Sequence, residues 1–102
     1  MYKLFIDDIR NPTTSDWIVA RSSAGALRTV QRFGMPHTIS FDHDLGEEDT
    51  TINFLNWMEK RLLDGTYVFP KDFKYFVHSA NPVGAANIHS KISQYLRYFK
   101  EN

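Results

Sequence analysis

Apolar residues along this chain form two kinds of pattern: short continuous runs, and longer stripes with helical spacing. The short runs are rich in strand-forming residues and predict β-strands at about 3–7, 17–22, 37–44 and 74–78. The helical stripes predict amphipathic helices at 24–34, from about 49–50 to 65, and at 83–99. Between the first two strands, Asn-Pro and a Thr/Ser/Asp cluster predict a loop rather than a helix.

Strands that alternate with helices predict one open, parallel α/β sheet with helices on both faces. A length of 102 residues suits a single domain. In such sheets the ligand binds outside the carboxyl ends of the strands, at a topological switch point. The polar residues that follow each apolar run are therefore the first candidates for a functional site.

Acidic residues follow two of these runs. Asp7 and Asp8 come after the first, and Asp42 and Asp44 flank His43 after the third. Two carboxylates about 4 Å apart repel by roughly 4 kcal/mol at an effective dielectric constant near 20, so a cluster needs a proton or a cation. Because hard divalent cations take oxygen ligands, Asp7, Asp8 and Asp42 predict a site for Mg²⁺ or Mn²⁺.

Residues after the third strand can be separated by the side of the strand on which they lie. Alternation sends Asp42 and Asp44 to one side of the strand and His43 to the other, which makes His43 the weaker catalytic candidate. The alternative role of His43 is a hydrogen bond to the neighbouring loop. The acids at 47–49 suit a solvated turn and a helix N-terminus, where the helix dipole favours negative charge.

The fourth strand ends in "HSANP". His78 is a candidate for proton transfer, and Ser79 and Asn81 are candidate donors to phosphate oxygens, ahead of a helix N-terminus that can bind an anion. The alternative is an ordinary helix cap made by Ser79 or Asn81. Arg10 suits either a phosphate contact or an ion pair with an aspartate, and the sequence leaves both open.

Composition narrows the function classes. Twelve basic and twelve acidic residues cancel, which excludes the strong positive field of a typical nucleic-acid binder. The absence of cysteine excludes disulfides, thiolate nucleophiles and zinc-thiolate sites. The chain contains no Walker loop, GxGxxG, GxSxG or HExxH motif. With no signal-like segment and no long apolar run, we expect a cytoplasmic location and no membrane contact.

The motifs "LFIDDIR", "ISFDHDLG" and "VHSANPVG" together resemble the cyclic-phosphate processing receiver-like domains, a branch of the response-regulator receiver fold. The resemblance implies a flavodoxin-like sheet of about four strands in the order 2-1-3-4. Asp7 and Asp8 match the metal-binding acid pair of receivers, and Asp42 matches the phosphoacceptor. Ser79 matches the hydroxyl residue that follows the fourth strand. The family's activity implies a cyclic phosphate of nucleotide or ADP-ribose type as the ligand.

Two receiver elements are missing from the sequence pattern. Residues 9–16 are too few and too rich in Pro and Thr for the first receiver helix, and no fifth strand with its phosphoryl-binding lysine follows the fourth. The loss of that lysine weakens the phosphoacceptor interpretation and favours chemistry on a bound ligand.

We therefore expect a metal-dependent phosphoesterase in which the cation polarises a phosphate oxygen and orients water. The catalytic candidates are Asp42, Asp44, His78 and His43; the substrate-binding candidates are Arg10, Ser79 and Asn81; the metal ligands are Asp7, Asp8 and Asp42. Asp44 would support the metal or activate the water, and His78 would protonate the leaving oxygen. A variant of this hypothesis has Asp42 attack the phosphate directly.

The rival hypothesis is a degenerate receiver that acts as a non-catalytic protein-binding or phosphoacceptor module. The feature that would distinguish this alternative is an exposed apolar patch on the last helix, made by Tyr95, Tyr98 and Phe99. For the enzyme we expect a small-molecule phosphate ligand, no sequence-specific nucleic-acid binding, and a monomer or weak dimer.

Overall fold

The computed structural model describes residues 1–100. The strands are β1 (Lys3–Ile6), β2 (Trp17–Ala20), β3 (Thr38–Phe41) and β4 (Lys74–Val77). The helices are α1 (Ser23–Phe33), α2 (Thr51–Leu63) and α3 (Pro82–Tyr95), and α3 continues into a π-helical turn, η1 (Leu96–Lys100). The strands are parallel and lie in the order β2-β1-β3-β4. This confirms the predicted α/β class and sheet order.

Local sequence explains most of the boundaries. The Ser22 side chain accepts a hydrogen bond from Gly25 N at 2.9 Å and caps α1, which ends at Gly34 with φ of 84°. Two strands are shorter than predicted, because β2 ends at Ala20 and β3 at Phe41. The acidic residues after β3 lie in the loop that leads to α2, not in the strand.

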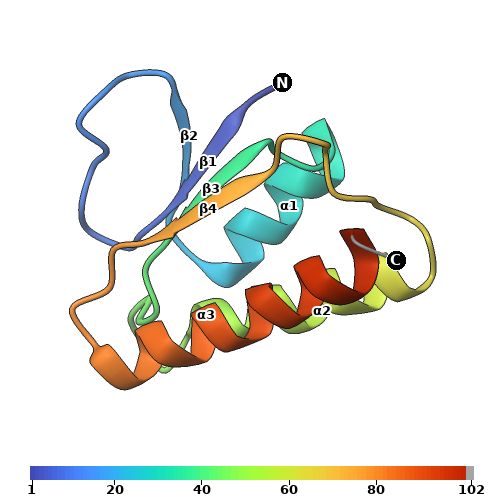
Figure 1. Cartoon of the computed structure of the whole chain (residues 1–102). Helices are drawn as coiled ribbons and strands as arrows, with labels where there is room; N and C mark the ends of the chain where they lie inside the picture. The colour runs from blue at the N-terminus through green and yellow to red at the C-terminus, as the bar shows by residue number, and fades with distance from the viewer. Residues whose placement is uncertain (101–102) are drawn as a thin grey trace.

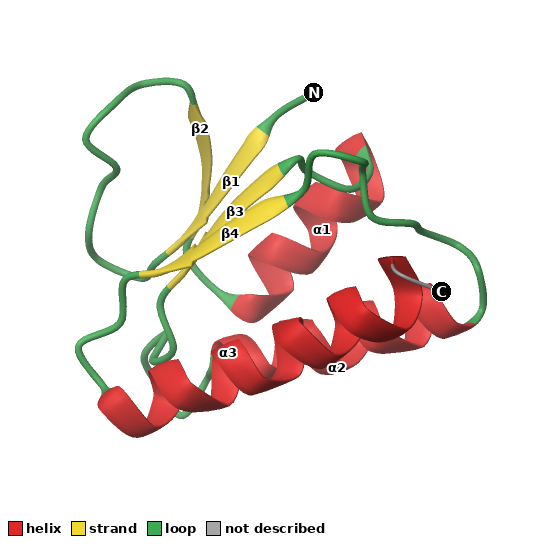
Figure 2. Cartoon of the chain, viewed as in Figure 1, coloured by secondary structure: helices red, strands yellow, loops and turns green. Residues whose placement is uncertain are grey.

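The hydrophobic core lies between the sheet and the helices. Leu4, Ile6, Ile39 and Phe41, at alternate positions of β1 and β3, are fully buried against residues from all three helices, including Val30, Phe54 and Ile88. Figures 1 and 2 show α1, α2 and α3 together on this one face of the sheet. The expectation of helices on both faces is therefore corrected.

Connectivity explains this arrangement. The crossovers from β2 to β3 and from β3 to β4 both move in the same direction across the sheet, and right-handed crossovers then put their helices on one face. The opposite face would need a helix between β1 and β2. That connection is a loop, which runs along the opposite side of the sheet from the helices (Figure 1).

We call the side of the sheet without helices the open face. Its strand residues are Lys3 and Phe5 of β1, Trp17 and Val19 of β2, Thr38 and Ser40 of β3, and Lys74 and Phe76 of β4. The next residues in the same alternation are Asp7, Asp42 and His78. The open face therefore ends in candidate site residues at its carboxyl edge.

The predicted aromatic patch on the last helix is only partly exposed. Tyr95 is buried, and its hydroxyl donates to Leu55 O, whereas Tyr98 is exposed beside a half-buried Phe99. Within residues 1–100, every helix is too short or too polar to cross a bilayer.

Candidate metal and phosphate site

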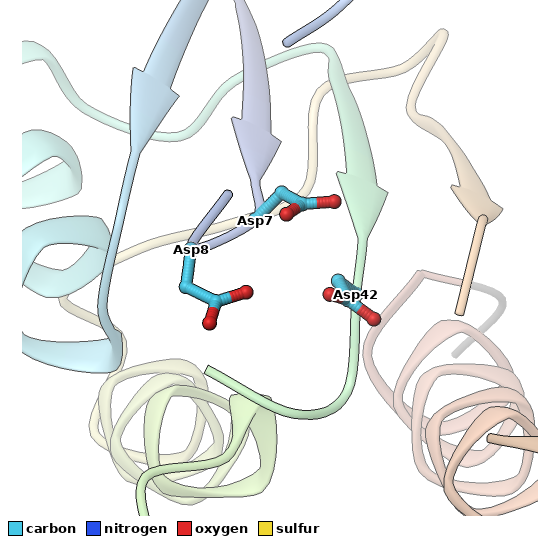
Figure 3. Close-up of side chains that lie close together, drawn as sticks. All are labelled: Asp7, Asp8 and Asp42. Atoms are coloured by element: carbon cyan, nitrogen blue, oxygen red, sulfur yellow. The ribbon is translucent and has the colours of Figure 1, made fainter. Parts of the chain in front are cut away.

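Three aspartates meet at the carboxyl edge of the central strands. Asp7 and Asp8 follow β1, and Asp42 follows the neighbouring β3 (Figure 3). One carboxylate oxygen from each lies within 4.8 Å of the other two. Asp7 and Asp42 are buried, with 1% and 8% of their surface exposed. We call these three residues the acidic trio; it is the group that the sequence predicted as metal ligands.

Asp7 is the most constrained member of the trio. Its Oδ1 accepts hydrogen bonds from the backbone N–H groups of Ile9 and Arg10, at 2.9 and 2.8 Å. Its Oδ2 accepts from Arg10 Nε at 2.9 Å and from His78 Nε2 at 3.0 Å. Burial alone would raise the pKa of Asp7, but these hydrogen bonds hold the pKa below its usual value. Asp7 is therefore an ionised carboxylate with four donors around it.

Arg10 supplies positive charge to the trio. In addition to its bond with Asp7, its Nη2 lies 3.6 Å from Asp42 Oδ1 and donates to His78 O at 2.9 Å. Half of the Arg10 side chain remains exposed. Of the two roles that the sequence left open, the structure shows the ion pair, and the phosphate contact stays a prediction.

Both ring nitrogens of His78 make hydrogen bonds, one of them to Asp7. Nε2 lies 3.0 Å from Asp7 Oδ2, and Nδ1 lies 2.7 Å from Ser40 Oγ. The ring also stacks on Phe5, with centroids 4.5 Å apart. Burial lowers the pKa of His78, which favours the neutral ring at pH 7. Because ionised Asp7 only accepts, Nε2 carries the proton and Nδ1 accepts from the Ser40 hydroxyl.

His43 contacts α3 on the other side of the sheet from Asp42, as alternation predicts. Asp44, predicted on the Asp42 side, lies with His43 instead, because residues 42–44 belong to a loop and not to β3. Its ring packs so closely on Gly84 of α3 that a Cβ added there would lie 2.3 Å from His43 Cγ. His43 Nδ1 lies 3.0 Å from Asp44 Oδ1, and Asn81 Nδ2 donates to Asp44 Oδ2 at 3.2 Å. The hydrogen bond from His43 lowers the pKa of Asp44. These residues form a second polar group at the N-terminus of α3.

The residues before α3 make local hydrogen bonds in this structure. Asn81 Oδ1 accepts from Gly84 N at 3.0 Å, so Asn81 is the helix cap that the sequence offered as an alternative. Ser79 Oγ accepts from Asn81 N at 3.1 Å and holds the capping residue rather than the helix itself. Phosphate binding by Ser79 and Asn81 stays a prediction.

The acids at 47–49 lie outside the trio. Asp49 accepts hydrogen bonds from the Ser23 N–H at 2.8 Å and the Ser23 hydroxyl at 2.6 Å, so it joins the β3–α2 loop to the start of α1. Glu47 and Glu48 are exposed and have positive φ angles of 46° and 67°. This segment is the turn that the sequence predicted, with an added structural role for Asp49.

Sequence reasoning missed three supporting residues. Ser40 positions His78, Thr51 donates its hydroxyl to Asp42 O, and Arg21 donates to the carbonyl oxygens of Asp7 and Arg10. Alternation places Ser40 on the same side as Asp42, so a small polar residue within an apolar strand was the signal for it. No comparable local signal identifies Arg21 or Thr51, because their partners lie in other segments of the chain.

Comparison with known proteins adds one finding. The chain matches the family model of the cyclic-phosphate processing receiver domain over residues 2–94. That range includes all four strands, the acidic trio and both histidines discussed above. Neither the curated proteins nor the solved structures contain a match. The match covers most of the chain, far more than the three short motifs that first carried the resemblance.

Proposed function

Since the chain belongs to the cyclic-phosphate processing receiver family, we propose that it hydrolyses a cyclic phosphate at the acidic trio with the help of Mg²⁺ or Mn²⁺. The observation that supports this most is the approach of three carboxylate oxygens within 4.8 Å of one another. All three donors are hard oxygen ligands, which suit these cations. Family membership supports the ligand class, and the grouping of three carboxylates supports the choice of a cation.

The bound cation would polarise a phosphate oxygen and lower the pKa of a bound water. Asp7 has to give up one of its four hydrogen bonds to become a ligand. Arg10 is the partner that can leave, because its side chain is half exposed whereas the two backbone donors are fixed in the turn. The released guanidinium then contacts the substrate phosphate, for which its planar donor pair is suited.

The other candidate residues take roles around the phosphate. Ser79, Asn81 and the N-terminus of α3 bind phosphate oxygens. Asp44, held by His43 and Asn81, supports the metal or activates the attacking water. His78 is the general acid in its imidazolium form: the ring, neutral in the free site, takes up a proton at Nδ1 when the anionic phosphate binds. Its Nε2–H then exchanges Asp7 for the leaving oxygen, which receives the proton.

A melting experiment tests the cation site. A cation at 100 times its dissociation constant adds about 2.7 kcal/mol to the free energy of unfolding, so Mg²⁺ or Mn²⁺ should raise the Tm of the wild type. Asp8→Asn and Asp42→Asn should abolish the rise, and Asp72→Asn, which changes an exposed acid outside the trio, should keep it. Equal melting of the wild type with and without either metal would remove the cation from the proposal.

An activity assay tests the chemistry. The purified protein is incubated with each metal and with nucleoside 2′,3′-cyclic phosphates or ADP-ribose cyclic phosphate, and ring opening is followed by ³¹P NMR. We expect metal-dependent opening of at least one of these rings and none with Asp42→Asn. A protein that binds metal but opens none of the rings would contradict the proposed hydrolysis while leaving the cation site intact.

A further inference from the structure

The open face contains a hollow of about 360 Å³ that none of the roles assigned above explains. Phe5, Trp17 and Phe76 supply its aromatic lining, and the β1–β2 loop contributes residues 11–13 to its rim. A second hollow of about 360 Å³ continues along the same face and shares Thr13, Trp17 and Phe76 with the first. Both lie on the side of the sheet that no helix covers (Figure 2).

The first hollow adjoins the acidic trio. Arg10 and His78 line it, and both donate hydrogen bonds to Asp7 Oδ2, at 2.9 and 3.0 Å. Two side chains that line the hollow are therefore bonded directly to one member of the trio, Asp7. A molecule with its phosphate at the trio would have its remaining atoms directed either to solvent or into this hollow.

The distribution of residues on the open face is uneven. A sheet face in contact with water normally carries polar residues, and Lys3, Thr38 and Lys74 follow this rule at the end away from the trio. Next to the trio, Phe5 of β1 pairs with Ser40 of β3, and Ser40 pairs with Phe76 of β4. The Phe76 residue is 54% exposed. An exposed phenylalanine beside an acidic site has no role in the core, since the core lies on the other face.

We propose that this hollow binds the aromatic ring of the ligand, a nucleobase, while the ligand's phosphate lies at the acidic trio; this inference rests on the proposed function. Phe76 on one side and Trp17 on the other present flat apolar surfaces for stacking, which every nucleobase can use. Asn11 and Thr13 at the rim offer hydrogen bonds to the edge of the base. The substrate is then a nucleoside cyclic phosphate.

A kinetic comparison tests this assignment. We compare kcat/KM for adenosine 2′,3′-cyclic phosphate with kcat/KM for glycerol 1,2-cyclic phosphate, which has no aromatic ring to stack. The ratio of the two values measures the contribution of the base. Phe76→Ala should lower this ratio by about 10-fold, mainly through KM, because stacking contributes to ground-state binding. Phe33→Ala is the matched control: Phe33 is also 54% exposed but lies at the end of α1, and the ratio should not change.

A binding experiment needs no turnover. Trp57→Phe leaves Trp17 as the sole tryptophan, and adenosine should then quench its fluorescence in a saturable way. Adding Phe76→Ala should weaken the affinity by about 10-fold, and adding Phe33→Ala should not. A saturable, Phe76-dependent signal supports the ring site even if no cyclic phosphate is opened, in which case only the proposed hydrolysis fails.

Another set of results would keep the proposed hydrolysis and rule out the ring site. If glycerol cyclic phosphate is opened but adenosine leaves the Trp17 fluorescence unchanged and Phe76→Ala leaves the kcat/KM ratio unchanged, hydrolysis stands and the ring site is overturned. A dimer in size-exclusion chromatography that Phe76→Ala converts to a monomer would also overturn it, because the open face would then bind a second copy of the chain.

Discussion

Asp7 shows how single residues determine the state of the site. Four donors surround its carboxylate, and Arg10 is the one whose side chain is half exposed. The guanidinium lowers the repulsion between Asp7 and Asp42 in the absence of metal. A cation bound as proposed would therefore compete with Arg10 for the same negative charge.

The first prediction follows from this competition. Arg10→Gln should lower stability without metal by about 1 kcal/mol, since hydrogen bonds to a charged group are lost at a partly exposed site. The rise in Tm produced by Mg²⁺ should become larger, and KM for a cyclic phosphate should increase. Arg28→Gln, which changes an exposed arginine of α1, serves as control in the same melting and kinetic measurements. A smaller metal effect in Arg10→Gln would show that Arg10 assists the cation.

The second prediction separates the two histidines. His78→Gln keeps an N–H donor for Asp7 but cannot transfer a proton, so turnover should fall by about 10²–10⁴-fold while the metal-induced rise in Tm remains. His43→Ala should reduce turnover less and act mainly on stability, because its ring packs on α3. Should His43→Ala stop hydrolysis while His78→Gln remains near wild type, the proton donor is His43.

At the scale of elements, the packing of α3 against the β3–α2 loop brings together the second polar group, which consists of His43, Asp44 and Asn81. The His43 ring occupies the space where residue 84 would carry a side chain, and Asn81 caps α3 while it holds Asp44. The position of α3 thus depends on having glycine at its first turn. This requirement is steric, since the backbone of Gly84 is not in the left-handed region.

The third prediction tests that contact. Alanine is favoured over glycine within a helix by about 1 kcal/mol, yet Gly84→Ala should destabilise the protein by about 1–3 kcal/mol because Cβ overlaps the base of the His43 ring. In the His43→Ala background the same change should cost less, because the ring is gone and only the contact with Cβ of residue 43, at 2.7 Å, remains. Urea unfolding of the four proteins in this cycle gives the coupling energy, and additive effects would contradict the proposed overlap.

At the scale of the whole molecule, one face of the sheet carries the helices α1, α2 and α3 (Figure 1), and the other is lined by the hollow next to the acidic trio. The residues on the open face belong to four strands, and the acidic trio lies at the carboxyl edge of the central two. Within residues 1–100 no fifth strand follows α3. In a receiver a lysine after that strand binds the phosphoryl group, and residues 1–100 include no strand in that position.

The fourth prediction therefore concerns phosphorylation. Beryllofluoride or a small-molecule phosphodonor should produce little change in the NMR signals of β4 and α3, because residues 1–100 include no fifth strand with a phosphoryl-binding lysine. Metal alone should still shift the signals of Asp7, Asp8 and Asp42. A stable, stoichiometric adduct on Asp42 would instead support the receiver-type signalling function.

The sequence by itself determined the elements, the strand order and the residues of the acidic trio. Apolar runs and helical stripes are local patterns, and the acids follow two of the runs directly. Parallel strands bring their carboxyl ends to one edge of a sheet, so Asp7 and Asp42 had to meet once the order 2-1-3-4 was assigned. The order itself came from the resemblance of the motifs to the receiver fold, and the structure confirms it.

Only the tertiary structure decided which face carries the helices and how the site's charges are paired. The handedness of each crossover acts at the level of whole β-α-β units, and no local pattern records that both units turn to the same side. The contact of His78 with Asp7 joins residues 71 positions apart, and that of Ser40 with His78 joins residues 38 apart. Such contacts depend on the register between strands and on side-chain packing, which is why the strand-end acids were predictable and their partners were not.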